Sequence, residues 1–437
     1  MQDVKREGVK RKDVKREDVK RKDVKHEESQ IAGDEPRPSR FTFHALRFTF
    51  HASRNFLLIT LADLIARTAY QMGKTPLLPV FAASLGASNA FLGLIVSVST
   101  FTGMVLKPLI GALSDRWGRR WWLLAGTAFF AIMPFLYRFV TTPEQLFLIR
   151  IVHGLATAIY GPVTLAYVAE QTGPRRAEGL GWFGLARSGG YILGPALAGW
   201  LLLRMPPPQV FTVIGVLGSL AFIPVLMLPA DAKPRTRTRP PILRQIRAGL
   251  SAGGHTPAIW LAGGLEATAF IALYAAKAFL PVYATQAGLN IGLIGLFFSV
   301  QEGVHVLGRP LAGRLADRRG YPQLIAAGMA AMAVALPLLT VVQGPVALLA
   351  LAALLGAGQA LVFPSTIALI AVQVDPHHLG AGMGLLGTMQ NAGKVIGPVL
   401  AGLLLTRMSY GGMFQFMGGL LLVGALVVGI AGRERRA

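Results

Sequence analysis

Ionisable side chains are rare in the long apolar runs of this chain, and several recur at helical spacing. One helix face would present four polar residues at steps of four, four and three: Asp63, Arg67, Gln71 and Lys74. Ionisable groups in an apolar environment are costly and usually line a cavity or pair with each other. We therefore expect a cavity-lining stripe with a proton site at Asp63, tuned by Arg67. The alternative is a static ion pair between these two residues.

Other polar residues in the apolar runs extend this set of candidates. Glu266 and Lys277 are eleven residues apart, which places them on one helix face, and either Glu266 or Glu302 could carry the proton instead of Asp63. Histidine titrates near neutral pH, although a lone helical His more often has a packing role. The remaining candidates are Arg150, His153 and His305 for proton coupling, and Tyr70, Arg187, Tyr274, Gln390, Asn391 and Lys394 for the cavity lining.

The elements that must position these residues are long apolar segments. The chain has 437 residues, of which 53% are hydrophobic and 15% charged. About 20 apolar residues span a bilayer as a helix, and the runs are too long for barrel strands of about 10 residues. The sequence predicts an all-α membrane protein with twelve transmembrane helices, at 55–82, 90–113, 121–140, 145–170, 179–203, 210–230, 257–284, 291–314, 323–342, 345–372, 379–406 and 412–431.

The basic residues gather in every second loop between these segments. The net charge is +22, yet only Arg138, Arg204 and Arg407 fall in the alternate loops, which is typical of a membrane protein with cytoplasmic termini. We expect the cell (inner or plasma) membrane as its location. The basic excess lies in short loops rather than on a folded soluble domain, so no nucleic-acid partner is expected. The absence of cysteine excludes disulfides and thiolate metal sites, and we expect no metal.

The segments outside the apolar runs have a different composition. Residues 1–54 contain a five-residue charged repeat and are predicted to be a disordered cytoplasmic tail. A basic arm on anionic lipid and a start codon assigned too far upstream are the alternatives. Residues 231–256 are rich in Pro and Arg and would link two six-helix bundles, 55–230 and 257–431, before a short tail at 432–437.

The two predicted bundles are copies of one another. The stretch from Lys107 to Gly118 returns 202 residues later as Arg309 to Gly320, and Pro79, Gly154 and Pro162 have matching residues at the same offset. In the fifth segment of each bundle the offset becomes 203, which pairs the Gly190–Gly199 region with Gly393–Gly402. Internal repeats of this kind are typical of secondary transporters.

The repeated stretch also carries the signature of a known family. Gly111-Ala-Leu-Ser-Asp115-Arg116-Trp-Gly118-Arg119 resembles the loop between helices 2 and 3 of the major facilitator superfamily, and Gly313, Asp317 and Arg318 belong to its second copy. The resemblance covers residues 55–431 and implies two pseudo-symmetric six-helix bundles around a central cavity. It also implies a latch in which Asp115 faces the positive N-terminal end of helix 11 and the arginines add hydrogen bonds. The glycines of the motif would let the chain turn sharply and approach a neighbouring helix. The alternative is that the arginines only set the topology.

Two further motifs resemble those of the family's drug:proton antiporters. The fifth helix carries Gly181, Gly190, Gly194, Pro195 and Gly199, with Ala198 where Gly is usual. These small residues could equally serve helix packing, and helix 11 repeats them. Arg150 heads a third motif that the family links to proton coupling, in which His153 replaces the usual Gln. A buried Arg in this role would hold a nearby acid ionised. The alternative is an Arg that reaches the membrane interface.

These observations predict what the protein does and what it does not need. The Gly-x-Gly-x-x-Gly runs at 179 and 382 lack a preceding strand, so they are no dinucleotide site, and no ATP site is indicated. We expect no enzymatic activity and no cofactor, with the proton gradient as the energy source. The expected function is proton-coupled efflux of a small amphipathic compound by a monomer in the bilayer. An importer of a sugar, organic acid or peptide and a non-transporting sensor or scaffold are the alternatives.

Overall fold

Helices account for all regular secondary structure in the residues that the computed structural model describes, which are 53–229, 257–342, 344–374 and 379–434. Every helix described below belongs to one compact unit, Ala52–Ala437. The predicted tail up to residue 52, the whole of the predicted linker, and the side chains of Asp115 and Arg116 lie outside this description.

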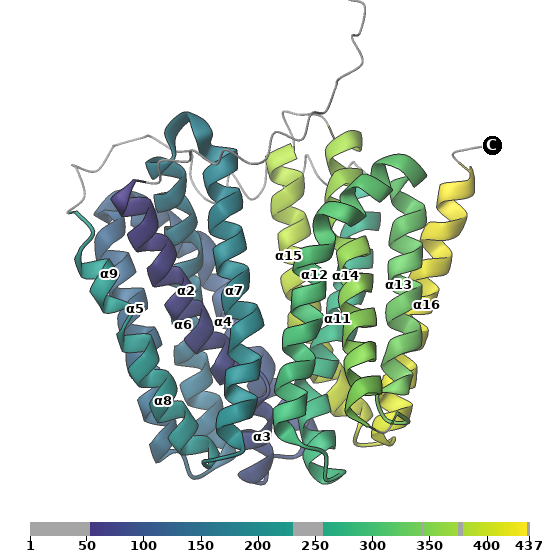
Figure 1. The fold of residues 1–437 in the computed structure, drawn as a ribbon, viewed down its shortest axis with the longest axis horizontal. Coiled ribbons are helices and arrows are strands. Elements are labelled where there is room, and N and C mark those ends of the chain that lie inside the picture. Colours follow the sequence, from purple (N-terminus) through teal and green to yellow (C-terminus); the bar gives the residue numbers. More distant parts are fainter. Residues whose placement is uncertain (1–52, 230–256, 343, 375–378, 435–437) are drawn as a thin grey trace, which may run out of the picture. The chain divides into compact units, whose positions relative to one another are not determined.

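The first half of the described unit contains six predicted segments, two of them divided into shorter helices. Its elements are α2 (Arg54–Lys74), α3 (Leu77–Ser84), α4 (Asn89–Trp117), α5 (Arg119–Leu136), α6 (Pro143–Gln171), α7 (Arg176–Leu202), α8 (Pro207–Ser219) and α9 (Phe222–Leu226) (Figure 1). The predicted helix 55–82 is interrupted because Pro76 has no backbone N–H and cannot continue the hydrogen bonding of α2. The predicted helix 210–230 is divided between α8 and α9.

The second half contains six continuous helices. They are α11 (Pro257–Gln286), α12 (Ile291–Arg319), α13 (Tyr321–Leu338), α14 (Pro345–Gln373), α15 (Leu379–Leu404) and α16 (Tyr410–Glu434). Nine segments of the described residues are long and apolar enough to cross a bilayer. The long helices α2, α7 and α15 do not reach this threshold of length and hydropathy. Each of them carries charged or amide side chains of the candidate site. The predicted all-α membrane architecture is confirmed, and the described helices are consistent with the predicted count of twelve.

The helix packing repeats from one half to the other. In the first half α2 packs on α7, α4 on α6, and α5 on α8; in the second half α11 packs on α15, α12 on α14, and α13 on α16. The contacts between the halves are also paired, because α4 packs on α15 and α12 packs on α7. This arrangement is the pseudo-symmetry that the internal repeat predicts.

The two halves meet near one end of the bundle. We call the end where α2 begins and α16 finishes the termini end, which is uppermost in Figure 1, and the other the opposite end. Near the opposite end, the Ser97 hydroxyl donates to the Val395 carbonyl at 2.8 Å, and the Ala196 N–H donates to the Ser299 hydroxyl at 3.0 Å. A Cβ on Gly199 would lie 2.9 Å from the Gly295 Cα, so glycine permits this close approach.

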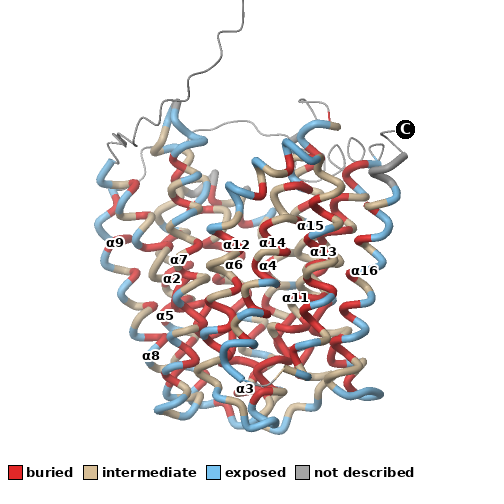
Figure 2. The backbone as a smooth tube through the Cα atoms, turned by 45° about the vertical axis from the view of Figure 1, so that its right-hand side comes forward, coloured by how far each residue is buried: buried red, intermediate tan, exposed pale blue. Residues whose placement is uncertain are grey.

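The same helices are less closely covered toward the termini end. Glycines in that part have no neighbour within 4 Å of a Cβ position: Gly111 of α4, Gly181 and Gly184 of α7, Gly303 and Gly313 of α12, and Gly384 and Gly387 of α15. Figure 2 shows the buried stretches on the inner sides of the helices, with exposed stretches on the outer helices and at the ends. The halves are therefore closed together at the opposite end in this conformation.

The turn that follows each copy of the repeated motif has the same cause in both halves. Gly118 ends α4 with φ of 85°, and Gly320 ends α12 with φ of 95°. Both values lie in the region that L side chains rarely adopt, so glycine is required for the chain to reverse directly into α5 and α13. The sharp turn expected from the sequence is present in both copies.

Candidate functional site

The charged residues of the membrane helices face the interior of the protein. Relative exposure is 1% for Asp63, 1% for Arg150 and 0% for Glu266. Arg67 and Lys74 are each 9% exposed and His305 is 5% exposed. A charged side chain directed into lipid would lie on the outer surface of the protein and have a large exposed fraction. These side chains are therefore available to one another, and their partners decide what each can do.

Asp63 is held by an arginine from another helix. Arg187 of α7 donates from Nε and Nη2 to the two Asp63 oxygens at 2.9 and 2.8 Å, and its Nη2 also donates to the Thr164 hydroxyl of α6 at 2.9 Å. The expected local partner, Arg67, lies farther away, at 3.8 Å from Oδ1. The main partner of Asp63 is thus Arg187, which the sequence suggested only as a cavity-lining residue.

Glu266 occupies the corresponding position in the second half but has neutral partners. The Thr366 hydroxyl of α14 and the Gln390 amide of α15 both donate to its carboxylate. Asp63 and Arg187 are 124 residues apart, and so are Glu266 and Gln390, while Thr164 and Thr366 are related by the repeat offset of 202. Within the described residues, no basic side chain lies within 4.0 Å of the Glu266 carboxylate.

A lysine near the cavity also occurs in both halves. Lys277 of α11 lies 3.9 Å from Glu302 of α12, which in turn contacts the His305 ring at 3.2 Å. Lys74 of α2 precedes Lys277 by 203 residues, but its ammonium meets the Thr100 hydroxyl of α4 at 3.4 Å. Thr100 in turn precedes Glu302 by the repeat offset of 202. The cation is kept in both halves, and the carboxylate partner is present in only one.

The two halves therefore differ in the charge of the partners of their acid and their lysine. In the first half the acid, Asp63, has a cationic partner, and the lysine, Lys74, has a neutral one. In the second half the acid, Glu266, has neutral partners, and Lys277 has an acidic one. One buried carboxylate and one buried ammonium are left without an opposite charge in direct contact.

A small cavity between the halves brings several of these residues together. It has a volume of about 10 Å³, close to the space for one water molecule. Its walls come from α2, α7, α11 and α12, with Thr75 between α2 and α3: Gln71, Lys74, Thr75, Tyr191, Pro195, Tyr274, Lys277, Phe298 and Glu302. We call this the central cavity. It contains Gln71 and Tyr274, which the sequence proposed as lining residues.

Other proposed lining residues lie elsewhere. Gln390 binds Glu266, the Asn391 amide donates to Gly387 of its own helix at 2.8 Å, and the Lys394 ammonium lies 4.2 Å from the centre of the Phe270 ring. Tyr70 contacts the rings of Phe130 and His153 edge to face, with centroid distances of 5.7 Å in both cases. Tyr70 therefore belongs mainly to a different cavity.

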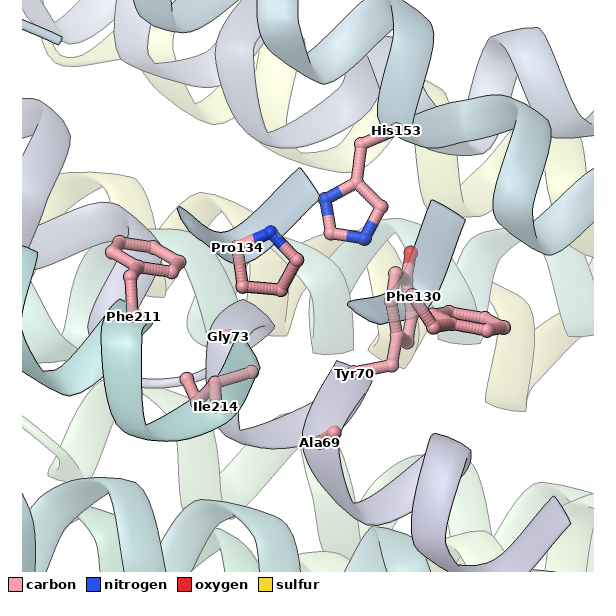
Figure 3. A pocket seen from close by; sticks show the side chains of 8 residues that line it. All are labelled: Ala69, Tyr70, Gly73, Phe130, Pro134, His153, Phe211 and Ile214. Atoms are coloured by element: carbon pink, nitrogen blue, oxygen red, sulfur yellow. The ribbon is translucent and has the colours of Figure 1, made fainter. Parts of the chain in front are cut away.

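That second cavity lies within the first half and is lined by Ala69, Tyr70, Gly73, Phe130, Pro134, His153, Phe211 and Ile214. Figure 3 shows the His153 ring directed toward the other lining side chains. The Tyr137 hydroxyl lies 2.9 Å from His153 Nδ1, whereas His153 Nε2 has no hydrogen-bond partner. The cavity has a volume of about 10 Å³, so it could hold one water molecule.

Arg150 is buried beside this second cavity and does not reach the membrane interface. It donates to the Ser99 hydroxyl and, at 3.5 Å, to the Tyr137 hydroxyl. No carboxylate of the described residues lies within 4.0 Å of its guanidinium. The expectation that Arg150 holds a neighbouring acid ionised is thus not met in this conformation. Its partners are hydroxyl groups.

The predicted latch stays a prediction, because the side chains of Asp115 and Arg116 lie outside the described residues. Gly111 and Gly313 approach no neighbour, contrary to expectation. Arg119 makes a double hydrogen bond to Glu170 of α6, at 2.9 and 2.8 Å, within its own half. Asp317 accepts a hydrogen bond from the Tyr321 hydroxyl at 3.1 Å, and Arg318 is exposed. These contacts agree with a termini end at which the halves are apart.

The glycines of the proposed antiporter motif pack helices together. A Cβ on Gly190 would lie 2.9 Å from Arg67 of α2, and Gly194 faces Gln71 one turn along the same helix. The repeated glycines of α15 face α11 in the same manner. Gly181 contacts nothing, and Pro195 lines the central cavity. Packing explains this motif in both halves, so it gives no evidence for the direction of transport.

Several partners of the candidate residues were not anticipated. They are Ser99, Thr100, Tyr137, Thr164, Arg309 and Thr366, where Arg309 contacts the His305 ring at 3.3 Å. The repeat offset would have revealed part of this set, since it relates Thr164 to Thr366 and Thr100 to Glu302. No cluster of metal-binding side chains occurs among the residues for which positions are described.

Comparison with known proteins agrees with this arrangement. The sequence profile of the Major Facilitator Superfamily matches residues 59–304 and 267–437. An MFS-type transporter of Methanocaldococcus jannaschii is 26% identical over 361 residues, which cover 81% of this chain and 91% of the relative. The quinolone resistance protein NorA of Staphylococcus aureus is 29% identical over 165 residues, which cover 37% of this chain and 42% of NorA.

Solved structures share the fold at low sequence identity. The nucleoside transporter NupG has a TM-score of 0.71 at 15% identity, covering 86% of this chain and 98% of NupG. An inward-facing bacterial homologue of the human lysosomal transporter Spinster has a TM-score of 0.65 at 16% identity, covering 88% of this chain and 96% of the homologue. Since the family profile spans nearly all of the helical unit, the chain belongs to the Major Facilitator Superfamily and is a membrane transporter rather than an enzyme.

Proposed function

We propose that this transporter exports a small amphipathic compound in exchange for protons by alternating access, and that Glu266 carries the proton. The observation that carries this proposal is the set of partners of Glu266, which is fully buried and, among the described residues, receives its hydrogen bonds from Thr366 and Gln390. A buried carboxylate without a cation is costly in its ionised form, so it can gain or lose a proton as its surroundings change.

The other two intramembrane acids are less suited to this role. Protonation of Asp63 would break two hydrogen bonds to Arg187 and leave two guanidinium groups without their counter-ion. Protonation of Glu302 would leave Lys277 without its acidic partner. Asp63 and Glu302 therefore serve best as permanent counter-ions, and Glu266 is the group whose charge can change during the cycle.

The proposed cycle uses two conformations of the halves. The positive loop charges favour a cytoplasmic position for the termini end, and we infer from this that the described conformation faces inward, with the halves closed at the outer end. Glu266 would release its proton toward the cytoplasm here and take up another when the outer end opens. Antiport requires that proton and substrate favour opposite conformations, because each ligand can shift the equilibrium only through its different affinity for the two.

The direction of transport rests on the similarity to NorA, whose name describes quinolone resistance. Import of a sugar, organic acid or peptide is the alternative within the same fold, and the nucleoside transporter NupG has this fold too. A non-transporting sensor or scaffold is disfavoured by the buried charges, because unpaired charges are costly in a protein that has no use for them.

Reconstitution into liposomes tests the proposal. An imposed pH gradient should drive transport of at least one of three probes of different charge: nalidixate, its neutral carboxamide and tetraphenylphosphonium. Glu266→Gln should lower gradient-driven transport at least tenfold yet retain exchange of labelled for unlabelled substrate without a gradient. Gln390→Arg, which copies the Asp63–Arg187 pair into the second half, should have the same effect.

The matched control is Glu144→Gln, which removes an exposed carboxylate from the first turn of α6. It should transport at the wild-type rate. Gradient-driven transport that persists at the wild-type rate in both Glu266→Gln and Gln390→Arg would contradict the role of Glu266. A protein that moves none of the probes in response to a pH gradient would contradict proton coupling.

A further inference from the structure

The interior of the membrane helices contains more positive than negative charge. Away from the two ends of the helical bundle, seven Lys and Arg side chains that are not exposed stand against three carboxylates in the described residues, an excess of four. The cations are Arg67, Lys74, Lys107, Arg150, Arg187, Lys277 and Lys394, and the acids are Asp63, Glu266 and Glu302. Buried charges of one sign repel each other strongly in a low dielectric, so such an excess requires compensation.

The protein's own acids compensate only some of these cations. Asp63 contacts Arg67 and Arg187, and Glu302 contacts Lys277. Lys74 lies in the wall of the central cavity and is 9% exposed. Within the described residues, no carboxylate comes within 4.0 Å of its ammonium. Its hydrogen-bond partner is the neutral Thr100 hydroxyl, at the position where the second half has Glu302.

A second ammonium lies close to Lys74 in the same cavity. The Lys74 and Lys277 ammonium groups lie 5.0 and 5.3 Å from the centre of the same ring, Tyr274. Aromatic groups line the rest of the wall, with Tyr191 and Phe298 beside Tyr274. The central cavity thus combines a positive potential with an aromatic surface.

We propose that the central cavity, which has space for about one water molecule in this conformation, widens as the halves move and binds an organic anion, with Lys74 as the principal contact. The anion would be a carboxylate or phosphate group on an aromatic body. The anionic group would lie beside Lys74 as the Glu302 carboxylate lies beside Lys277. The aromatic body would contact Tyr191, Tyr274 and Phe298. This inference rests on the proposed transport function and narrows the amphipathic substrate to one charge class. A charge-assisted hydrogen bond from Lys74 would distinguish the anion from its neutral analogue.

Equilibrium binding to the purified full-length protein tests the charge preference. The probes are nalidixate, its carboxamide, 4-nitrophenyl phosphate and tetraphenylphosphonium. Nalidixate or 4-nitrophenyl phosphate should bind about ten- to a hundredfold more tightly than the carboxamide, as expected for a hydrogen bond to a charged group. Equal or tighter binding of tetraphenylphosphonium, or the absence of measurable binding by both anions, would overturn the inference.

Two variants test whether Lys74 makes the contact. Thr100→Glu installs the acid that the second half already has at the corresponding position, so the fold has a precedent for it. It should weaken anion binding about ten- to a hundredfold by occupying Lys74, while Thr100→Gln should not. Lys74→Gln should weaken it similarly. Arg407→Gln, which removes an exposed cation far from the cavity, should bind the anions like the wild type. Undiminished anion binding by Thr100→Glu and Lys74→Gln would overturn the assignment.

The outcomes separate this inference from the proposed function. Gradient-driven transport of tetraphenylphosphonium without anion binding would leave proton-coupled export intact and overturn the anion site. Anion binding that depends on Lys74, in a protein that does not respond to a pH gradient, would support the anion site and contradict proton coupling.

Discussion

The pair formed by Asp63 and Arg187 should be structural, and its coupling energy can be worked out from its geometry. Asp63→Asn would leave Arg187 and Arg67 facing a neutral amide, so we expect it to lower the free energy of unfolding by about 3–5 kcal/mol. Arg187→Gln removes hydrogen bonds of 2.9 and 2.8 Å but leaves Arg67 at 3.8 Å as a counter-ion. Its cost should be smaller, about 2–3 kcal/mol.

The double variant should recover part of this loss. Since the side chains introduced at both positions would be neutral, the combined cost should fall below the sum of the single costs by about 2 kcal/mol. A second cycle, with Glu266→Gln and Gln390→Leu, should give a coupling energy of only about 1 kcal/mol, because the Gln390 amide is a neutral donor.

Unfolding in mixed micelles with a rising fraction of sodium dodecyl sulfate measures both cycles through tryptophan fluorescence. If the Asp63–Arg187 pair only stabilises the fold, Asp63→Asn should transport at the wild-type rate when the rate is divided by the amount of folded protein. A coupling energy near zero for Asp63 and Arg187, or equal values in the two cycles, would refute the assignment of different roles to the two acids.

Two more predictions concern the conformational cycle. In Gly199→Leu the added side chain would collide with Gly295, whose Cα lies 2.9 Å from the Cβ position, so the outer end should stay open. The contact between Ser97 of α4 and Val395 of α15 lies at the same end and should open with it. Because the chain has no cysteine, Ser97→Cys reports this change, and maleimide should label it in the Gly199→Leu background but not in wild type. Export of one anion for one proton moves two elementary charges per cycle, and each is worth about 2.3 kcal/mol per 100 mV. A potential negative inside, imposed with valinomycin, should therefore speed anion export, whereas a rate independent of potential would indicate electroneutral symport.

The sequence predicted the elements well because membrane helices are specified locally. A run of about 20 apolar residues has only one stable structure in a bilayer, so each expected segment corresponds to a helix or a pair of helices. The interruption at Pro76 was missed because a hydrophobic count does not register a missing N–H. The repeat likewise predicted the pairing of the halves before any contact was known.

The partners of the site residues could not be predicted in the same way. Helical spacing draws attention to Arg67 as the neighbour of Asp63, since they are four residues apart. The closer partner, Arg187, is 124 residues away and reaches Asp63 because Gly190 lets α7 approach α2. Arg150 was expected beside an acid but meets hydroxyl groups. Spacing along one helix fixes which side chains share a face, and it does not fix what packs against that face.

The internal repeat offers a way to separate structural from functional charges. Two copies that began alike would carry the same acid and the same lysine, each with the same partner. The partners now differ: Arg187 corresponds to Gln390, and Thr100 corresponds to Glu302. Gln390 leaves Glu266 without the positive partner that Asp63 has, and Thr100 leaves Lys74 without the negative partner that Lys277 has. A carrier that exchanges a proton for an anion needs one acid that can change its charge and one cation that can change its partner. Glu266 and Lys74 are the residues at which the broken symmetry leaves those two groups.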